Sequence, residues 1–115
     1  MWLKRKGDRA EDQALDYLKQ AGLDLISRNY RCRQGEIDLI MKDREYLVFV
    51  EVRYRKNSRF GGAAMSVDWR KQKKIIACAK QYLQKLNKIP PCRFDILAIE
   101  DKSQVEWLKN AFEAS

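Results

Sequence analysis

Two apolar stretches separated by a short polar break carry acidic residues where a buried strand would normally hold hydrocarbon. They cover residues 35–41 and 47–53, and the acids stand at Glu36, Asp38 and Glu51. Burying a carboxylate is costly unless a cation or several hydrogen-bond donors compensate its charge. The sequence therefore favours a divalent cation held between the two stretches.

The spacing of the two stretches predicts a β-hairpin whose turn is residues 44–45. Such an even-numbered loop sets a register in which Asp38 faces Glu51 and Glu36 faces Arg53. Directly opposed side chains have Cβ atoms about 4.5–5.5 Å apart, so Asp38 and Glu51 are expected to share one ion. The same register gives an apolar opposite face that pairs Ile37 with Val52, Leu39 with Val50, and Met41 with Val48.

The chain contains no histidine and three widely separated cysteines. The lack of histidine excludes Ser-His-Asp and Cys-His hydrolases and the histidine-based metalloproteases. Cys32, Cys78 and Cys92 show no CxxC spacing, so we expect reduced, partly buried thiols rather than a disulfide or a zinc site. With hard oxygen ligands only, Mg²⁺ or Mn²⁺ is the expected metal, and without P-loop spacing no small-molecule cofactor is indicated.

The formal net charge of +8 predicts a polyanionic partner, either nucleic acid or an anionic surface. Basic residues concentrate between Arg53 and Lys74, directly after the acidic strands, and aromatic residues are interleaved with them. Phosphates held by this tract would lie close to a bound metal. The expected nucleic-acid-binding residues are Arg55, Lys56, Arg59, Arg70 and Lys74.

A length of 115 residues and a hydrophobic content of 45% predict a single globular domain. No run of 18 apolar residues is present, so no membrane span is expected. The basic N-terminus is not followed by the apolar segment of a signal peptide. These features predict a soluble, cytoplasmic protein.

Hydrophobic periodicity predicts two helices. Residues 7–21 carry an apolar stripe at helical spacing, with Asp8 as the expected N-cap. A second stripe predicts a helix that begins at Val67 or Asp68 and ends at Asn87, shortly before two prolines.

The remaining apolar segments predict strands. Residues 23–32 indicate a first strand near a sheet edge, residues 93–100 an interior strand, and residues 105–108 a last edge strand. The connection through the second helix should make strands 46–53 and 93–100 parallel. The expected fold is therefore one α/β domain over residues 1–115, with the order αβββαβ and a central mixed sheet flanked by helices.

The order of these residues resembles two known groups of proteins. Asp38 followed by Glu51-x-Arg53 resembles the PD-(D/E)xK nuclease signature. More narrowly, the chain is similar to the bacterial UPF0102 family over nearly its whole length. The matching motifs are Gly7 with Glu11, Arg28-Asn29, residues 35–40, residues 48–55, Phe60-Gly61, Lys71-Gln72 and residues 93–95.

The resemblance implies a restriction-endonuclease-like core related to archaeal Holliday-junction resolvases. It also implies divalent-metal-dependent hydrolysis of DNA phosphodiester bonds, on branched or otherwise structured DNA. In that scheme Asp38 and Glu51 are the metal ligands, and Glu11 occupies the position of a further ligand. Glu36 is an additional ligand, a residue that orients water, or an ion-pair partner of Arg53. Glu11 is explained equally well as a capping-box residue.

The nuclease signature has lysine where this chain has Arg53. Arginine keeps the positive charge but does not act as a base. Three alternatives are open: Arg53 stabilises charge while the metal activates water, Lys71 reaches the site in its place, or activity is lost and a nucleic-acid-binding or accessory protein remains.

Two further alternatives concern partners. The acids Asp38 and Glu51 are also explained as a pair neutralised by neighbouring arginines, and the basic face as a surface for an acidic protein. Junction resolvases commonly need two sites on a homodimer. The candidate dimer face is the apolar C-terminal group of Trp107, Leu108 and Phe112.

Overall fold

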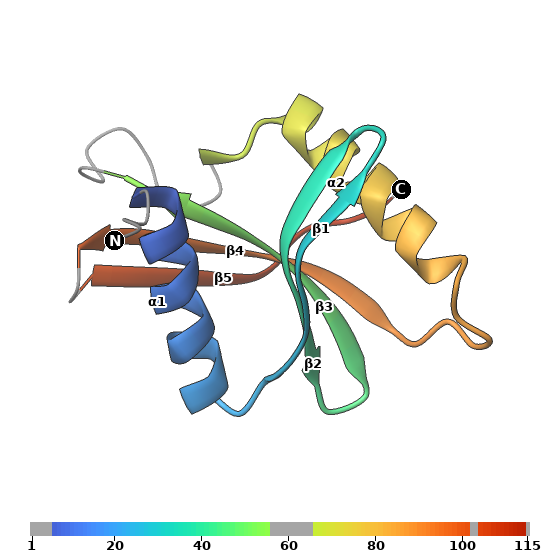
Figure 1. The fold of residues 1–115 in the computed structure, drawn as a ribbon, viewed down its shortest axis with the longest axis horizontal. Coiled ribbons are helices and arrows are strands. Elements are labelled where there is room, and N and C mark those ends of the chain that lie inside the picture. Colours follow the sequence, from blue (N-terminus) through green and yellow to red (C-terminus); the bar gives the residue numbers. More distant parts are fainter. Residues whose placement is uncertain (1–5, 56–65, 102–103, 115) are drawn as a thin grey trace, which may run out of the picture.

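Stretches of apolar residues form five strands that hydrogen-bond side by side in one mixed sheet. The computed structural model describes residues 6–55, 66–101 and 104–114. The sheet order is β1-β2-β3-β4-β5, so each strand lies beside its neighbour in the sequence (Figure 1). The strands are β1 (Asp24–Cys32), β2 (Gly35–Asp43), β3 (Tyr46–Tyr54), β4 (Cys92–Asp101) and β5 (Gln104–Phe112).

Two helices close two hydrophobic cores on opposite faces of the sheet. α1 (Lys6–Gln20) packs against one face and α2 (Trp69–Leu83) against the other. Alternate side chains of β3 divide between the cores, since Val48 and Val50 belong to the α1 core while Leu47 and Phe49 belong to the α2 core. A sheet covered on both faces can bury an interior strand completely, and this holds β3 in place.

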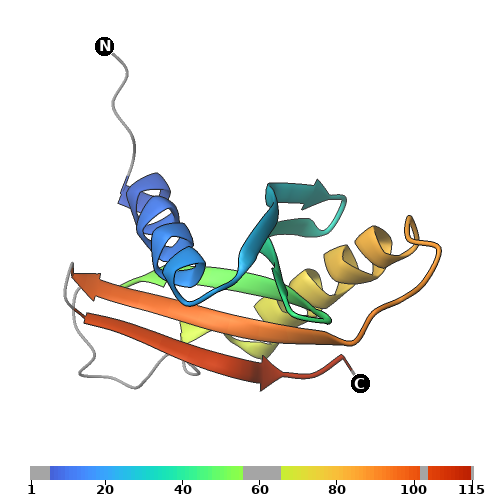
Figure 2. The same ribbon diagram turned by 90° about the horizontal axis from the view of Figure 1, so that it is seen from below.

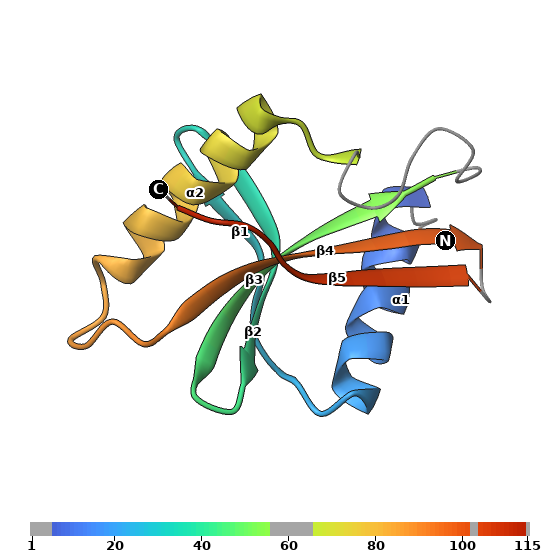
Figure 3. The same cartoon turned by 180° about the vertical axis from the view of Figure 1, so that it is seen from behind.

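The predicted α/β class, the order αβββαβ and the mixed central sheet are confirmed. β3 and β4 run parallel, and the other neighbouring pairs are antiparallel. The final edge strand is longer than the expected residues 105–108, and Figure 3 shows it alongside β4. This architecture is consistent with a restriction-endonuclease-like core.

The helix ends differ from the expectation in two places. α1 begins at Lys6, so Asp8 lies within the helix rather than at its N-cap. α2 begins as expected after Asp68, whose Oδ1 accepts a hydrogen bond from the backbone N–H of Lys71 at 2.9 Å. It ends at Leu83 instead of Asn87, because the next residues close tighter turns with bonds between residues three apart.

The register of the β2–β3 hairpin is confirmed near its turn. Asp43 pairs with Tyr46 across the two-residue turn, and Leu39 pairs with Val50. The paired residues of the two strands end at Leu39 and Val50. The expected pairs of Asp38 with Glu51, Ile37 with Val52 and Glu36 with Arg53 are therefore not part of the ladder.

Beyond Leu39, β2 continues with β1 alone. We call residues 28–38 of this two-stranded segment the projecting ribbon, which rises away from the sheet in Figure 2. Two-stranded ribbons twist more strongly than wide sheets. Ile37 therefore packs in the α2 core and not with Leu39 in the α1 core, contrary to the expected apolar face.

The expectation of free thiols is wrong for two of the three cysteines. Cys32, at the end of β1, forms a disulfide with Cys78 on α2 across a sequence separation of 46 residues, and Cys92 is free. Their Cα atoms are 5.4 Å apart, within the usual range for disulfides. The two residues meet because the projecting ribbon packs onto α2, a tertiary contact that cysteine spacing does not reveal.

Reducing the Cys32–Cys78 bond is expected to lower the free energy of unfolding by about 2–4 kcal/mol, because the bond restricts the unfolded chain over a long loop. Urea titration with and without dithiothreitol measures the difference. The double variant Cys32→Ser/Cys78→Ser is the control, and its unfolding should not respond to the reductant. Equal urea midpoints for the oxidised and reduced wild-type protein would contradict the assignment.

The candidate dimer residues at the C-terminus pack within the chain itself. Phe112 is buried in the α2 core, Leu108 packs against that core, and Trp107 packs against the α1 core. Phe112 is therefore taken up by the core, while Trp107 and Leu108 are half-buried, and the dimer surface stays a prediction. Within the described ranges, neither helix has the length and apolar character needed to cross a membrane.

Candidate metal centre

Asp38 lies where β2 separates from β3. Its Oδ2 accepts a hydrogen bond from the backbone N–H of Val52 at 2.8 Å. This bond joins the two diverging strands and holds the Asp38 carboxylate close to Glu51, whose charge acts on it.

Glu51 is a carboxylate buried in the sheet, with an exposed fraction of 3%. Its Oε2 lies 3.5 Å from Lys71 Nζ and 3.6 Å from Arg53 Nη1. Its Oε1 is buried without a hydrogen-bond partner among the described residues. An unsatisfied buried carboxylate oxygen is costly, so a cation at Oε1 would stabilise this arrangement.

The electrostatics of the pair point the same way. Burial, followed by the negative charge of Glu51, raises the pKa of Asp38 from 3.8 to about 8, although the Val52 N–H bond opposes the shift. Glu36 adds a smaller effect that also raises this pKa. Two carboxylates so close in a buried place do not both ionise at low cost. A divalent cation would remove the cause of that cost.

Glu11 reaches the same region from α1. Its side chain is buried, and burial followed by the charge of Asp38 raises its pKa. Arg28 opposes that shift, because Arg28 Nη2 lies 3.3 Å from Glu11 Oε1 and 2.9 Å from Asp12 Oδ1. Glu11 therefore faces the sheet and pairs with Arg28, and the capping-box explanation fails because α1 begins before Asp8.

Arg28 also belongs to this site, although the sequence alone gives it no role there. It stands in the middle of β1 and connects two acids of α1 to the sheet. The available signal was an arginine in the middle of a strand of mixed polar and apolar residues. A charged side chain at such a position usually has a buried partner.

The other predicted residues lie around the pair at varying distances from it. Glu36 Oε2 lies 3.6 Å from Arg31 Nε across the projecting ribbon, rather than beside Arg53. Arg55 Nη2 lies 3.3 Å from Glu106 Oε1 of β5, so the structure does not bring it to the acids. The exposed predicted cations on α2 are Arg70 and Lys74, while Lys56 and Arg59 lie outside the described residues.

The acid pair fits Mg²⁺ or Mn²⁺. Asp38 and Glu51 supply hard oxygen donors, and the unsatisfied Glu51 Oε1 lacks only a positive partner. Across residues 6–55, 66–101 and 104–114, no group of three acidic or cysteine side chains converges to hold an ion. Mg²⁺ is usually bound by one or two carboxylates together with waters and substrate phosphates, so two ligands suffice. Glu11 and Glu36 interact with this pair through charge, since Glu36 raises the pKa of Asp38 and Asp38 raises the pKa of Glu11.

The raised pKa of Asp38 predicts a pH-dependent stability in the absence of metal. Between about pH 4 and 8, Asp38 holds a proton in the folded protein that it has lost in the unfolded chain. This proton stabilises the folded state, and its contribution to the free energy of unfolding disappears as the pH rises through 8. From pH 5 to 8 the unfolding free energy of the wild type should fall relative to that of Asp38→Asn by about 1 kcal/mol or more. Urea titrations with chelator at both pH values measure this, and parallel profiles would argue against it.

Comparisons with known proteins give the same family as the sequence motifs. A sequence model described as "Uncharacterised protein family UPF0102" matches residues 10–99. A UPF0102 protein of Janthinobacterium sp. (strain Marseille) is 56% identical over 108 residues, covering 94% of this chain and 87% of that protein. A UPF0102 protein of Psychromonas ingrahamii is 58% identical over 109 residues, covering 94% and 89%. The chain therefore belongs to the UPF0102 family.

Proposed function

We propose that this protein is a divalent-metal-dependent endonuclease of the PD-(D/E)xK type that hydrolyses DNA phosphodiester bonds. The observation that supports it most is the acid pair, in which Asp38 has a raised pKa and Glu51 keeps a buried, unsatisfied oxygen. Structural acids normally find their hydrogen-bond partners in the folded chain. This pair keeps a buried oxygen that no described residue satisfies, as a cation site would.

In this proposal Asp38 and Glu51 bind the Mg²⁺ or Mn²⁺ ion. The ion, when bound, activates water and neutralises charge on the phosphate. The Val52 N–H holds the Asp38 carboxylate in its orientation, so that Asp38 needs little rearrangement to bind.

Two positively charged side chains beside Glu51 are positioned to bind the phosphate of the DNA backbone. Lys71 Nζ and Arg53 Nη1 both contact Glu51 Oε2, and both side chains are more than a third exposed, so they can also reach a bound DNA strand. Lys71 thus approaches Glu51 from α2, whereas the nuclease signature has its lysine on β3, at the position of Arg53. Arg53 supplies fixed positive charge, and Lys71 supplies the lysine that the nuclease signature contains.

The neighbouring basic residues support a DNA substrate. Arg70 and Lys74 are exposed on α2 on either side of Lys71. Such contacts neutralise flanking phosphates and make affinity salt-dependent. The cytoplasm, where bacterial DNA lies, is the proposed compartment, and its reducing conditions would make the Cys32–Cys78 bond dependent on oxidation.

A cleavage assay with purified protein tests the proposal. Duplex, single-stranded, flapped and four-way DNAs are incubated with Mg²⁺, Mn²⁺ or chelator. Cleavage of at least one DNA with metal, and of none with chelator, is the expected result. Cleavage that persists in chelator would contradict a metal-dependent reaction.

A second candidate function is a nucleic-acid-binding or accessory protein on the same fold. Arg53 in place of the signature lysine favours it, because arginine cannot act as a base. It predicts salt-sensitive DNA binding without turnover on any DNA of the same assay. Turnover with any metal would exclude it.

A further inference from the structure

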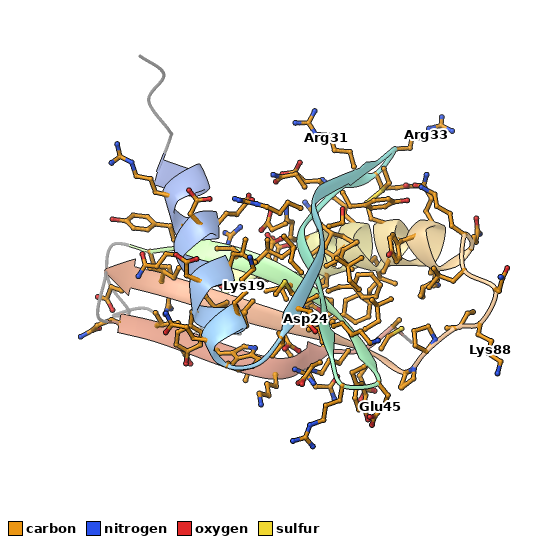
Figure 4. The ribbon with its side chains drawn as sticks, turned by 60° about the horizontal axis from the view of Figure 1, so that its bottom comes forward. Lys19, Asp24, Arg31, Arg33, Glu45 and Lys88 are labelled. Atoms are coloured by element: carbon orange, nitrogen blue, oxygen red, sulfur yellow. A yellow bond between two sulfur atoms is a disulfide. The ribbon has the colours of Figure 1, made fainter. Side chains whose placement is uncertain are left out.

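The projecting ribbon ends in two exposed arginines. β1 and β2 pair as far as Cys32 with Gly35, beyond the point where β2 has left β3. Arg31 has an exposed side-chain fraction of 83%, and Arg33 in the turn is also exposed. Figure 4 shows both side chains pointing away from the body of the protein. We call Arg31 and Arg33 the arginine tip.

One face of the ribbon is anchored to α2. The ring of Tyr30 contacts the ring of Tyr82 edge-on, with centroids 5.3 Å apart, and Cys32 is bonded to Cys78. These contacts fix the position of the arginine tip relative to α2. A rigidly placed binding group loses less conformational entropy on binding than a flexible one.

The ribbon also connects the arginine tip to the acid pair. Arg31 pairs with Glu36, and Asp38 stands two residues further along the same strand. Alternation places Glu36 and Asp38 on one face, opposite the face that carries Tyr30 and packs on α2. At about 3.3 Å per residue, Glu36 lies roughly 7 Å from Asp38, and Gly35, where the strand meets the turn, roughly 10 Å. One bound DNA molecule can therefore contact both.

Arg31 is available for such a contact. Its ion pair with Glu36 has a separation of 3.6 Å and is exposed to solvent, and ion pairs of that kind contribute little stability. A phosphate or base edge would compete successfully for the guanidinium. The exchange would also release Glu36 from its ion pair with Arg31, so that its negative charge would add to that of Asp38 and Glu51.

We propose that the arginine tip contacts double-stranded DNA within about three base pairs of the bond aligned with Asp38 and Glu51. This inference rests on the proposed function, because it names the form of DNA taken by the same site. A two-stranded β-ribbon fits the major groove of a duplex, and arginine is the commonest side chain that reads guanine there.

Recognition of a single strand would need a different surface. Proteins that bind single strands stack the bases on exposed aromatic rings. Among the described residues, the large exposed hydrophobic side chains stand outside the projecting ribbon, residues 28–38. They are Tyr17, Ile26, Tyr46, Tyr54, Trp69 and Ile89. The substrate class that fits is therefore DNA with an intact duplex beside the cleaved bond.

The double variant Arg31→Ala/Arg33→Ala tests this inference by binding alone. Fluorescence anisotropy in chelator compares a labelled duplex with one of its own strands at fixed salt. We expect the Kd for the duplex to rise about tenfold or more, while the Kd for the single strand changes less than about threefold. Because both arginines are exposed, the variant should keep the wild-type melting temperature.

Lys19→Ala/Lys88→Ala is the matched control, since it removes the same charge from two exposed positions distant from the tip (Figure 4). Its Kd for the duplex should change less than about threefold. An equal loss in the control, or an equal loss for both DNAs with the tip variant, would overturn the inference.

The same measurements separate this inference from the proposed function. Tip-dependent duplex binding without metal-dependent cleavage would remove the endonuclease proposal and retain the duplex contact. If the tip variant binds and cuts duplex DNA like the wild type, in a metal-dependent reaction, the endonuclease proposal stands and the duplex contact of the arginine tip is removed.

Discussion

Asp38→Asn is expected to reduce metal-dependent DNA cleavage at least about 1,000-fold, while the Kd for DNA stays within about threefold of the wild-type value. Asparagine has nearly the shape of aspartate, and its carbonyl oxygen can still accept the Val52 N–H bond. The substitution therefore removes the negative charge and leaves the local structure in place.

Cleavage rates under single-turnover conditions with Mn²⁺ provide the measurement. Asp24→Asn is the matched control, because it makes the same chemical change at an exposed position on β1. Its cleavage rate should stay within about twofold of the wild-type rate. Undiminished cleavage by the Asp38→Asn protein would remove Asp38 from the reaction.

Asp95→Ala is expected to lower the free energy of unfolding by about 3–5 kcal/mol, the largest stability effect that the structure suggests. Asp95 is fully buried, and its carboxylate accepts hydrogen bonds from Trp107 Nε1 at 2.9 Å, the Asn110 backbone N–H at 2.9 Å and Arg93 Nε at 3.1 Å. Alanine would leave the buried Arg93 guanidinium short of one of its two acidic partners, the other being Asp43.

Urea unfolding measures this loss. Asp16→Ala removes an exposed carboxylate from α1 and should change the unfolding free energy by less than about 0.5 kcal/mol. A loss below about 1 kcal/mol for Asp95→Ala would show that the network around Asp95 does not hold β4 to β5 as described.

The parts of the fold that the sequence predicts are those determined by local spacing. The two-residue turn at residues 44–45 and the alternation of apolar residues after it are sufficient to align β2 with β3 up to Leu39. That alignment brings Asp38 to Glu51. Arg93 and Asp95, two residues apart on β4, also form an ion pair, at a distance of 3.1 Å.

Three of the errors have a common origin in the projecting ribbon. Where β2 leaves β3, strong twist turns Ile37 into the α2 core, breaks the expected pairing of Glu36 with Arg53, and brings Cys32 to Cys78. None of these contacts follows from residue spacing, because each depends on how the ribbon packs against a helix far away in sequence.

The contribution of Lys71 lies between these two cases. Lys71 lies at the start of α2, close to the beginning at Val67 or Asp68 that the sequence predicts for this helix. Its contact with Glu51 depends on how α2 crosses the sheet, so the sequence left Lys71 and Arg53 as alternatives. The structure places both beside Glu51.

Calorimetric titration with Mn²⁺ tests most directly whether Asp38 and Glu51 bind one cation together. The wild-type protein should bind the ion and release protons near neutral pH, because the pKa of Asp38 is raised to about 8 and the bound carboxylate must be ionised. Asp38→Asn and Glu51→Gln should each abolish the binding heat. Mn²⁺ binding of wild-type affinity by either variant would contradict the shared site.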